Sequence, residues 1–395
     1  MSRDATRYAT ILDDALNAAR EKDYEGWSKF DALNSPFLDA TTFGNQWLRL
    51  AAIQFVKESP VNLRPLFGVR KSRNPKGIAL FARAYLSRFA REGRPGDLDE
   101  ARRLLGWLLE NPSPGFENLC WGYNYVWQGI PPFCQEKGEP NVVVTAFVGE
   151  ALIAAYRATG EAALLEAARS AAEFMTRDLP VMFETATEQA VSYIPKETSS
   201  IVLNVQAMSG AYLAKVANDA GERRYAEIAA KRIAFTRERG AEGGGWYYAH
   251  PREKYRAIDN YHTGGIVDAF REYAEETGDE RTREAWREGL DFYDRRLFEA
   301  DGAPRWTSDS PYPRDVHGSA QGVLSFAAAG AEDPRRLERA RQIADWAIDN
   351  LYRPKTRDFA YRRGRLVKWN YSLMRWCNGW MARAFSALLE HTPRA

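Results

Sequence analysis

The sequence predicts an all-α protein, a single-domain (α/α)6 toroid in which six helical hairpins use residues 1–395. Three observations lead to this prediction. Stretches rich in small apolar residues alternate along the chain with charged amphipathic stretches. The small-residue stretch recurs six times, at intervals of roughly 53–65 residues, as in a repeat of helix pairs. Aromatic and polar residues gather in the segments that lead into these stretches.

The first helix pair shows the contrast between its two members. Residues 76–91 (KGIALFARAYLSRFAR) place small and apolar side chains on several faces, as a helix buried all round does. Residues 97–111 (DLDEARRLLGWLLEN) have one apolar face, as an outer helix does. Four more pairs follow in order, starting at residues 141 and 163, 200 and 223, 262 and 281, and 315 and 335.

The last small-residue stretch, from Ser372, has no charged partner after it. An N-terminal helix over about residues 4–22 would fill that place and close the ring, because no hairpin buries its apolar face alone. An open helical solenoid also fits the periods, but it leaves this last helix unexplained. Residues 43–57 predict one additional helix, which we expect to pack across an opening of the ring.

Composition limits the functions open to the chain. The net charge is only +2, from 55 basic and 53 acidic residues, so we expect no nucleic acid to bind. We expect no membrane span either, and acidic residues occupy the stretch where a signal peptide is apolar. Cys120, Cys134 and Cys377 follow no disulfide or zinc pattern. We therefore expect a cytoplasmic protein without a cofactor or a metal, and the oligomeric state stays open.

The segments that lead into the small-residue helices differ from the rest of the chain. Because inner helices that alternate with outer ones all point the same way, these segments should meet at one face, around the central cavity. They are long and aromatic, as in residues 120–133 (CWGYNYVWQGIPPF) and 304–317 (PRWTSDSPYPRDVH). The segments that leave the small-residue helices are short and carry glycine, as in residues 158–161 (ATGE). Long polar loops on a rigid scaffold usually carry function.

Four motifs in these segments resemble those of a bacterial family of polysaccharide-biosynthesis proteins. They are CWGYNYVWQ from Cys120, IDNYHTG from Ile258, YPRDVHGSAQG from Tyr312 and MRWCNGWM from Met374. The resemblance runs from about Phe43 to the end of the sequence. That family is placed with the six-hairpin glycosidase-like and prenyltransferase-type toroids. The resemblance implies a role in bacterial envelope or exopolysaccharide metabolism, and it supplies no reaction.

Two of the four histidines follow an aspartate at equivalent points of neighbouring repeats. Asp259 precedes His262, and Asp315 precedes His317, each where a small-residue helix begins. Either aspartate alone could be a helix N-cap, but both pairs should face one cavity. We predict that these four residues are catalytic in cleaving a glycosidic bond of a polysaccharide or oligosaccharide. Asp259 and Asp315 would be the acid and base, and the histidines would position or share protons.

Three alternatives stay open. A cofactor-free sugar epimerase or isomerase would use His262 and His317 as its acid–base pair. A glycan-binding component of a polysaccharide synthase complex would use the aromatic lining without catalysis. An isoprenoid cyclase would stabilise carbocations on the same rings, but the DxDD cluster of acids that suits such an enzyme does not occur.

Aromatic rings stack on sugar faces, and amide and guanidinium groups bond hydroxyls, so we expect the mouth residues to bind the glycan. The predicted substrate-binding residues are Trp121, Tyr123, Trp127, Asn141, Tyr193, Trp246, Tyr248, Asn260, Tyr261, Tyr312, Gln321, Arg375, Trp376 and Trp380. Among them, Arg375 suits bidentate binding of a carboxylate or phosphate. The basic run 361–368 (YRRGRLVK) borders the same face and is either a solvated hairpin or an attractor for an anionic glycan.

Overall fold

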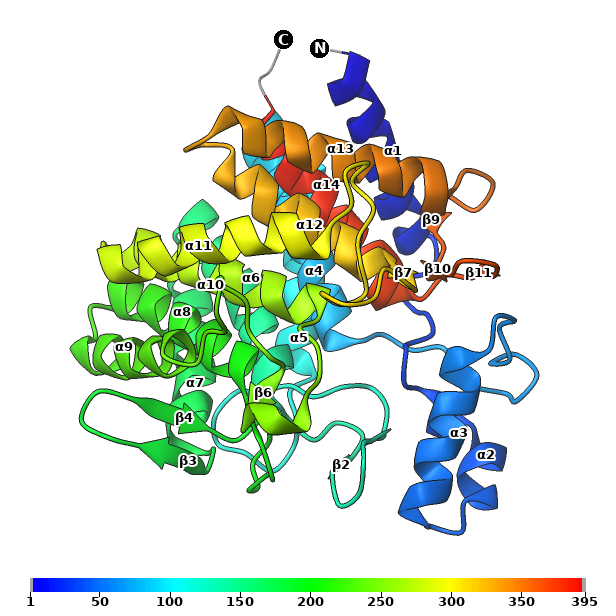
Figure 1. Cartoon of the computed structure of the whole chain (residues 1–395), viewed down its shortest axis with the longest axis horizontal. Coiled ribbons are helices and arrows are strands. Elements are labelled where there is room, and N and C mark those ends of the chain that lie inside the picture. The colour runs from blue at the N-terminus through cyan, green and yellow to red at the C-terminus, as the bar shows by residue number, and fades with distance from the viewer. Residues whose placement is uncertain (1–2, 393–395) are drawn as a thin grey trace.

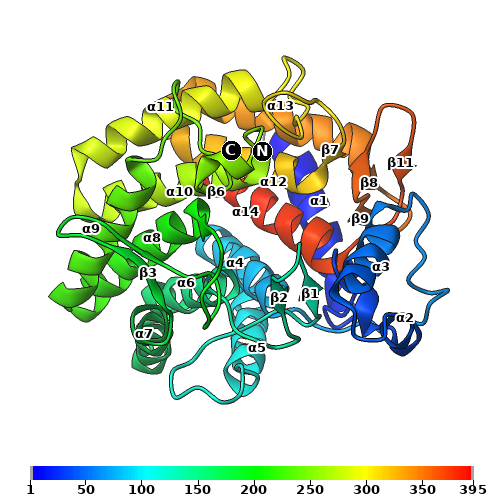
Figure 2. The same ribbon diagram turned by 60° about the horizontal axis from the view of Figure 1, so that its bottom comes forward.

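The six small-residue stretches are all helical in the computed structural model, which describes residues 3–392. They form the inner helices α4 (Pro75–Glu92), α6 (Val142–Thr159), α8 (Leu203–Ala220), α10 (Asn260–Thr277), α12 (Val316–Ala329) and α14 (Trp380–Glu390). Figure 2 shows them arranged around a common centre. Each packs against the next, and α14 packs against both α12 and α4. The ring is therefore closed, and the predicted toroid is confirmed.

The amphipathic stretches form the outer layer of the ring (Figures 1 and 2). The outer helices are α5 (Pro95–Glu110), α7 (Ala162–Arg177), α9 (Arg223–Arg237), α11 (Glu280–Leu297) and α13 (Pro334–Leu351). The sixth position belongs to α1 (Arg3–Arg20), which packs against α14 as expected of a closing N-terminal helix. Arg7 of α1 also pairs with Asp345 and Asp349 of α13, at 3.0 and 2.6 Å.

Small residues allow the inner helices to approach one another closely. A Cβ added to Gly149 of α6 would lie 2.4 Å from the Cζ of Tyr212 in α8. The same addition at Gly264 of α10 would lie 2.4 Å from the Cγ of Gln321 in α12. Within the described residues, α6 is the one helix long and apolar enough to cross a membrane, and 61% of it is buried inside the protein. Its composition suits a core helix packed between α4 and α8.

Helix caps explain why the two faces of the ring differ. Four inner helices begin at an N-cap residue whose side chain accepts a backbone N–H of the first turn. These residues are Asn74, Asn141, Asp259 and Asp315. Four end at a glycine in the left-handed conformation, namely Gly93, Gly160, Gly221 and Gly278. The chain therefore turns sharply where it leaves these inner helices, and the long loops gather at the face where the inner helices begin, which we call the mouth.

Short antiparallel strands join the mouth loops. They are β1 (Trp127–Gln128), β2 (Cys134–Gln135), β3 (Val181–Glu184), β4 (Gln189–Val191), β5 (Ile201–Val202), β6 (Ala249–His250), β7 (Arg314–Asp315), β8 (Tyr352–Arg353), β9 (Asp358–Phe359), β10 (Arg362–Arg363) and β11 (Lys368–Trp369). β5 pairs with β6, and β10 pairs with both β7 and β11. These pairs link the loops before successive inner helices, so residues of different repeats hold fixed positions at the mouth.

The additional helix predicted at residues 43–57 is α3 (Gln46–Glu58). With α2 (Pro36–Thr41) and the 3-10 turn η1 (Ala32–Asn34) it forms a separate apolar cluster around Leu33, Leu38, Ile53 and Val56. It lies at the edge of the ring, against β1 and the β10–β11 hairpin, and not across an opening as expected (Figure 2). Ile53 and Val56 of α3 are buried in this cluster, whereas Trp47, Leu48 and Phe55 stay exposed.

Two further short helices shape the mouth. The 3-10 turn η2 (Arg252–Lys254) lies in the loop before α10. The π-helical segment η3 (Met374–Gly379) leads directly into α14. Single π-turns of this kind often occur at functional sites.

Candidate active site

A cavity of about 660 Å³ occupies the centre of the ring. All six inner helices contribute side chains to its wall, and the mouth loops add a set of aromatic rings. It extends from these loops to Glu390 and His391 at the far end of α14. Its volume is typical of a small-molecule site, so the ring centre has room for a ligand.

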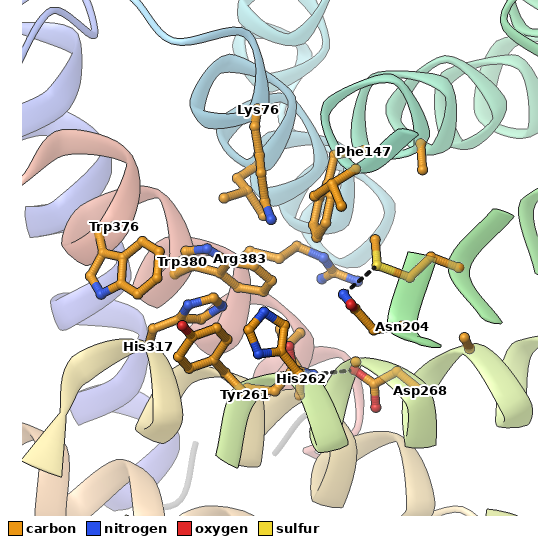
Figure 3. Close-up of a pocket in the computed structure, with 18 of the residues that line it drawn as sticks. Lys76, Phe147, Asn204, Tyr261, His262, Asp268, His317, Trp376, Trp380 and Arg383 are labelled. Carbon is orange, nitrogen blue, oxygen red and sulfur yellow. Dashed lines mark hydrogen bonds between the residues drawn. The ribbon is translucent and has the colours of Figure 1, made fainter. Parts of the chain in front are cut away.

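His262 faces this cavity (Figure 3), and Asp259 holds its ring. The Nδ1 atom of His262 lies 2.9 and 2.8 Å from the two carboxylate oxygens of Asp259. Asp259 also accepts the backbone N–H of His262 at 3.1 Å, as the N-cap of α10. The same aspartate is thus both a helix cap and the group that orients the imidazole. With Nδ1 donating to the carboxylate, Nε2 is the nitrogen left to exchange a proton.

His317 lies deeper in the same wall, with only 4% of its surface exposed. Its ring stacks on Tyr261 at 4.7 Å and contacts the rings of Trp376 and Trp380 at 4.5 and 4.1 Å. Neither ring nitrogen has a hydrogen-bond partner within the described residues. Burial holds the pKa of His317 well below its usual value, and the charges of Lys76, Lys29 and Arg375 lower it further. His317 is therefore a neutral imidazole.

Asp315 does not line the cavity, but it contacts residues that do. It is 3% exposed, caps α12 through the N–H of His317 at 2.9 Å, and accepts the indole N–H of Trp376 at 2.7 Å. Lys29 lies 3.8 Å from its other oxygen and 3.7 Å from the ring centre of Trp376. Burial lowers the pKa of Lys29 to about 7, although Asp315 opposes that shift. Asp315 fixes Trp376 and His317 in place.

Tyr261 joins the two histidines. Its ring lies 4.3 Å from that of His262 and 4.7 Å from that of His317. Burial raises the pKa of Tyr261 well above its usual value, and the charges of Asp259 and Asp315 add to the shift. Tyr261 therefore remains a neutral phenol, with a hydroxyl able to donate a hydrogen bond.

The structure brings most of the predicted site residues together. In addition to His262, eleven predicted residues line the cavity, namely Tyr123, Trp127, Tyr193, Tyr248, Asp259, Tyr261, His317, Gln321, Arg375, Trp376 and Trp380. The phenol oxygens of Tyr123 and Tyr193 lie 3.4 Å apart, and Tyr248 contacts the ring of His262 at 4.6 Å. The prediction that the Asp–His segments share one aromatic mouth agrees with this geometry.

Five other predicted substrate-binding residues lie outside the cavity wall, and their placement corrects the prediction. Trp121 and Trp246 are core residues whose indole N–H groups donate to the carbonyls of Leu108 and Thr236, at 2.9 and 3.1 Å. Asn141 is fully buried as the N-cap of α6.

Asn260 and Tyr312 complete that correction. The amide of Asn260 donates to the carbonyl of Leu297 at 2.8 Å, and its oxygen accepts from Tyr293 at 3.0 Å. Tyr312 lies in the loop before α12, where its ring contacts the guanidinium of Arg314 at 5.1 Å. In each of these five residues, packing or an internal hydrogen bond occupies the group that was expected to meet a sugar.

Several residues of the cavity wall were not among the predicted ones, and two of them carry charge near the histidines, Asp268 on α10 and Lys76 on α4 (Figure 3). Asp268 accepts a hydrogen bond from the amide of Gln321 at 2.6 Å. Burial raises its pKa to about 6, against the opposing effect of Arg271. Asp268 lies between the buried residues Val267 and Ala269 of α10, and an acid in such an apolar stretch is the signal that would have found it. Lys76 is the second residue of α4 and gives no such signal. Among residues 3–392, no cluster of three or more His, Cys, Asp or Glu has the arrangement of a metal site.

No protein-family model matches this sequence, and no curated protein matches it. Solved structures do match the fold. The chain has the six-hairpin toroid fold. An α-mannanase of family GH76 from Bacteroides thetaiotaomicron aligns with a TM-score of 0.61 and 13% identity, over 80% of this chain and 84% of that one. Cellobiose 2-epimerase from Bacillus thermoamylovorans aligns with a TM-score of 0.62 and 12% identity, over 80% and 87%.

A third similar structure is the unsaturated glucuronyl hydrolase from Bacillus sp. GL1. It aligns with a TM-score of 0.59 and 12% identity, over 79% of this chain and 84% of that one. Identities this low establish the shared fold alone. The resemblance to polysaccharide-biosynthesis proteins stays a prediction.

Proposed function

We propose that this protein is a carbohydrate-active enzyme that moves a proton at the carbon beside a sugar carbonyl, as an acid–base epimerase or isomerase. The observation that carries the proposal is the different use of the two Asp–His pairs. Both imidazoles line the cavity, whereas both aspartates are engaged as helix caps and as partners of a neighbouring side chain. The histidines are therefore the groups free to exchange protons with a ligand.

The two imidazoles have the complementary environments that such a reaction needs. A base must begin neutral, and an acid must begin protonated. His317 is buried, neutral and without a hydrogen-bond partner in the described structure, as suits the base. Asp259 lies beside Nδ1 of His262 and offsets the charge of a protonated ring, as suits the acid.

The reaction follows from these roles. His317 takes the proton from the carbon next to the carbonyl of an open-chain sugar, and the electrons of that C–H bond move onto the carbonyl oxygen as an enediolate. His262 then gives the proton on its Nε2 to the same carbon from the other side, and the electron pair on the oxygen re-forms the carbonyl, which yields the epimer. The Tyr261 ring contacts both imidazoles, and its hydroxyl can donate a hydrogen bond to the enediolate oxygen. In the reverse direction the two histidines exchange roles.

This assignment replaces the expected glycosidase pair of Asp259 and Asp315. A glycosidase needs two carboxyl groups that flank the scissile bond. Asp315 is 3% exposed and does not line the cavity, and both oxygens of Asp259 contact His262. Sugar epimerases and glycoside hydrolases share this fold, which supports a carbohydrate substrate. A role in bacterial envelope or exopolysaccharide metabolism in the cytoplasm is part of the proposal and rests on the sequence alone.

Solvent isotope incorporation tests the proposal. Glucose, mannose, galactose, cellobiose and their uronic acids would be incubated with the protein in D2O, and NMR would report deuterium beside the carbonyl and the configuration of the product. We expect deuterium in at least one sugar, and His262→Ala and His317→Ala should each slow its incorporation by about 100-fold or more. His250→Ala is the matched control, because His250 is exposed on β6 outside the cavity. Absence of deuterium from every sugar contradicts the proposal.

One observation favours hydrolysis as a second candidate function. Asp268 lines the cavity and has its pKa raised to about 6 by burial, as a protonated general acid requires. Release of new reducing ends from an oligosaccharide, lost in Asp268→Asn and kept in His317→Ala, would establish this function in place of proton transfer.

A further inference from the structure

Lys76 is a buried lysine that no carboxylate among the described residues contacts. It is 6% exposed, and in the part of the chain that the structure describes its ammonium has neither a hydrogen bond nor an ion pair. The Nζ atom lies 3.8 Å from the ring centre of Phe147 and 5.0 Å from that of Trp380, on the wall opposite the histidines (Figure 3). A buried charge without a partner is costly, so a protein retains one mainly where it serves a ligand.

The position of Lys76 in its helix adds to that cost. It is the second residue of α4, and the N-terminus of a helix disfavours positive charge. Burial holds the pKa of Lys76 well below its usual value, and the charge of Arg375 lowers it further. Both the helix and the neighbouring side chain would instead stabilise an anion at this point.

Arg375 is the second cation at this place. It is 2% exposed, and within the described residues its guanidinium has one hydrogen bond, to the Tyr125 hydroxyl at 3.3 Å, and no carboxylate partner. Its buried Nε has no hydrogen-bond partner among residues 3–392. Gly77, next to Lys76, lets η3 approach α4, since a Cβ there would lie 3.1 Å from the Cβ of Arg375. The two cations are thus brought together by a close helix contact.

Four of the five carboxylates of the cavity are engaged elsewhere, and the fifth, Glu390, lies at the far end of α14. Glu150 and Glu272 each bind Lys215 at 2.7 Å. Asp259 binds His262, and Asp268 accepts from Gln321. The wall around Lys76 and Arg375 is therefore positive, with two donors that converge on the cavity.

We propose that the sugar bound in this cavity carries an oxyanion, a carboxylate or a phosphate, which Lys76 and Arg375 bind together. The inference rests on the proposed function only in taking the ligand to be a sugar. Arg375 supplies a planar fork of N–H donors and Lys76 a point charge, a combination that suits an oxyanion. The basic run at residues 361–368 is a β10–β11 hairpin outside the cavity wall, so this recognition does not need it.

Lys76 and Arg375 could instead stabilise the negative charge of an enediolate. That alternative predicts a different result in binding measurements. That charge exists only during the reaction, so it would leave both cations unbalanced while the sugar is bound. A permanent anion on the substrate offsets them throughout. The two cases separate in binding measurements made without turnover.

Binding of matched sugars tests the proposal. Calorimetry or the fluorescence of Trp376 and Trp380 would compare glucose, galactose and mannose with their uronic acids and their 6-phosphates. We expect at least one anionic series to bind about 10- to 100-fold more tightly than its neutral parents. If the uronic acids gain more affinity than the 6-phosphates, the anion is a carboxylate; if the 6-phosphates gain more, it is a phosphate. Lys76→Met and Arg375→Met should remove this preference and leave weak binding of the neutral sugars.

A matched variant separates binding from folding. Lys215→Met removes a lysine of equal burial, but one that holds two glutamates, so it should lower the melting temperature. Lys76→Met removes an unpaired charge and should melt no lower than the wild type. Equal affinity for neutral and anionic sugars, or an anion preference that survives Lys76→Met, overturns the inference. Tight anion binding that depends on Lys76, without deuterium incorporation, supports this inference and refutes the proton-transfer proposal instead.

Discussion

Replacing Asp259 by asparagine tests the acid–base assignment at a single contact. Asparagine is as good an N-cap as aspartate, so its oxygen can still accept the His262 N–H that now lies 3.1 Å away. The amide NH2 group of the asparagine, however, would face Nδ1 of His262, which in the wild-type structure lies 2.8 Å from a carboxylate oxygen. Nδ1 would become the acceptor, the proton would move to Nε2, and no charge would offset a protonated ring.

The expected loss of activity follows from that reversal of tautomer. The equivalent change in a serine-protease triad lowers kcat by about 10⁴. His262 keeps 24% of its side chain exposed, so water partly replaces the carboxylate. We expect deuterium incorporation to fall by about 10²–10³, which corresponds to roughly 3–4 kcal/mol of transition-state stabilisation. Because the cap survives, the melting temperature should stay within about 2 °C of the wild type.

The control for this variant is Asp333→Asn. Asp333 is the N-cap of α13, accepts the N–H of Arg335 at 3.0 Å, and lies outside the cavity. It should keep full activity. If Asp259→Asn is folded and exchanges deuterium within about threefold of the wild-type rate, the carboxylate does not control the imidazole and the reasoning is wrong.

Three further predictions concern stability. Burial raises the pKa of Asp268 to about 6, so the folded state holds this proton more tightly than the unfolded state. This contribution to the free energy of unfolding is complete below about pH 4 and is lost as the pH rises through 6. In Asp268→Asn the free energy of unfolding, measured with urea, should lose this dependence, which amounts to about 3 kcal/mol between the two pH values. A variant with the same pH profile as the wild type contradicts the prediction. Gly264→Ala places a Cβ 2.4 Å from Gln321 and should destabilise by about 1–3 kcal/mol. At neighbouring Gly265 an added Cβ would meet no described atom within 4 Å beyond its chain neighbours and the backbone of its own helix, so alanine there should stabilise the protein by about 0.5–1 kcal/mol.

Helical periodicity was sufficient to predict the ring. An inner helix must be apolar on several sides and small where it meets its neighbours, and both properties are visible in stretches such as residues 141–156. The two Asp–His spacings also predicted correctly that the histidines lie in adjacent repeats at one mouth. The helical period and the Asp–His spacing depend on local backbone geometry, so both can be read from the order of residues along the chain.

The direction of individual side chains in the mouth loops was not predictable in the same way. Trp121 points into the core and Tyr123, two residues later, lines the cavity, because the loop between them follows no helical period. Lys76 looked like an ordinary residue at a helix start. Its importance depends on which charges are missing around it, and that is a property of the folded structure.

Closure of the ring by α1 has a consequence for how the protein forms. In this sequence α1, which packs against α14, precedes all the hairpins, and α14 follows them. Five hairpins can fold as they leave the ribosome, but the seam between α1 and α14 joins only after the whole repeat array has been made. This contact carries the largest loop-closure cost in the molecule and should form late. The cavity wall contributed by η3 and α14, with Arg375 and Trp376, is therefore completed in the final step, so an unfinished chain has no working site.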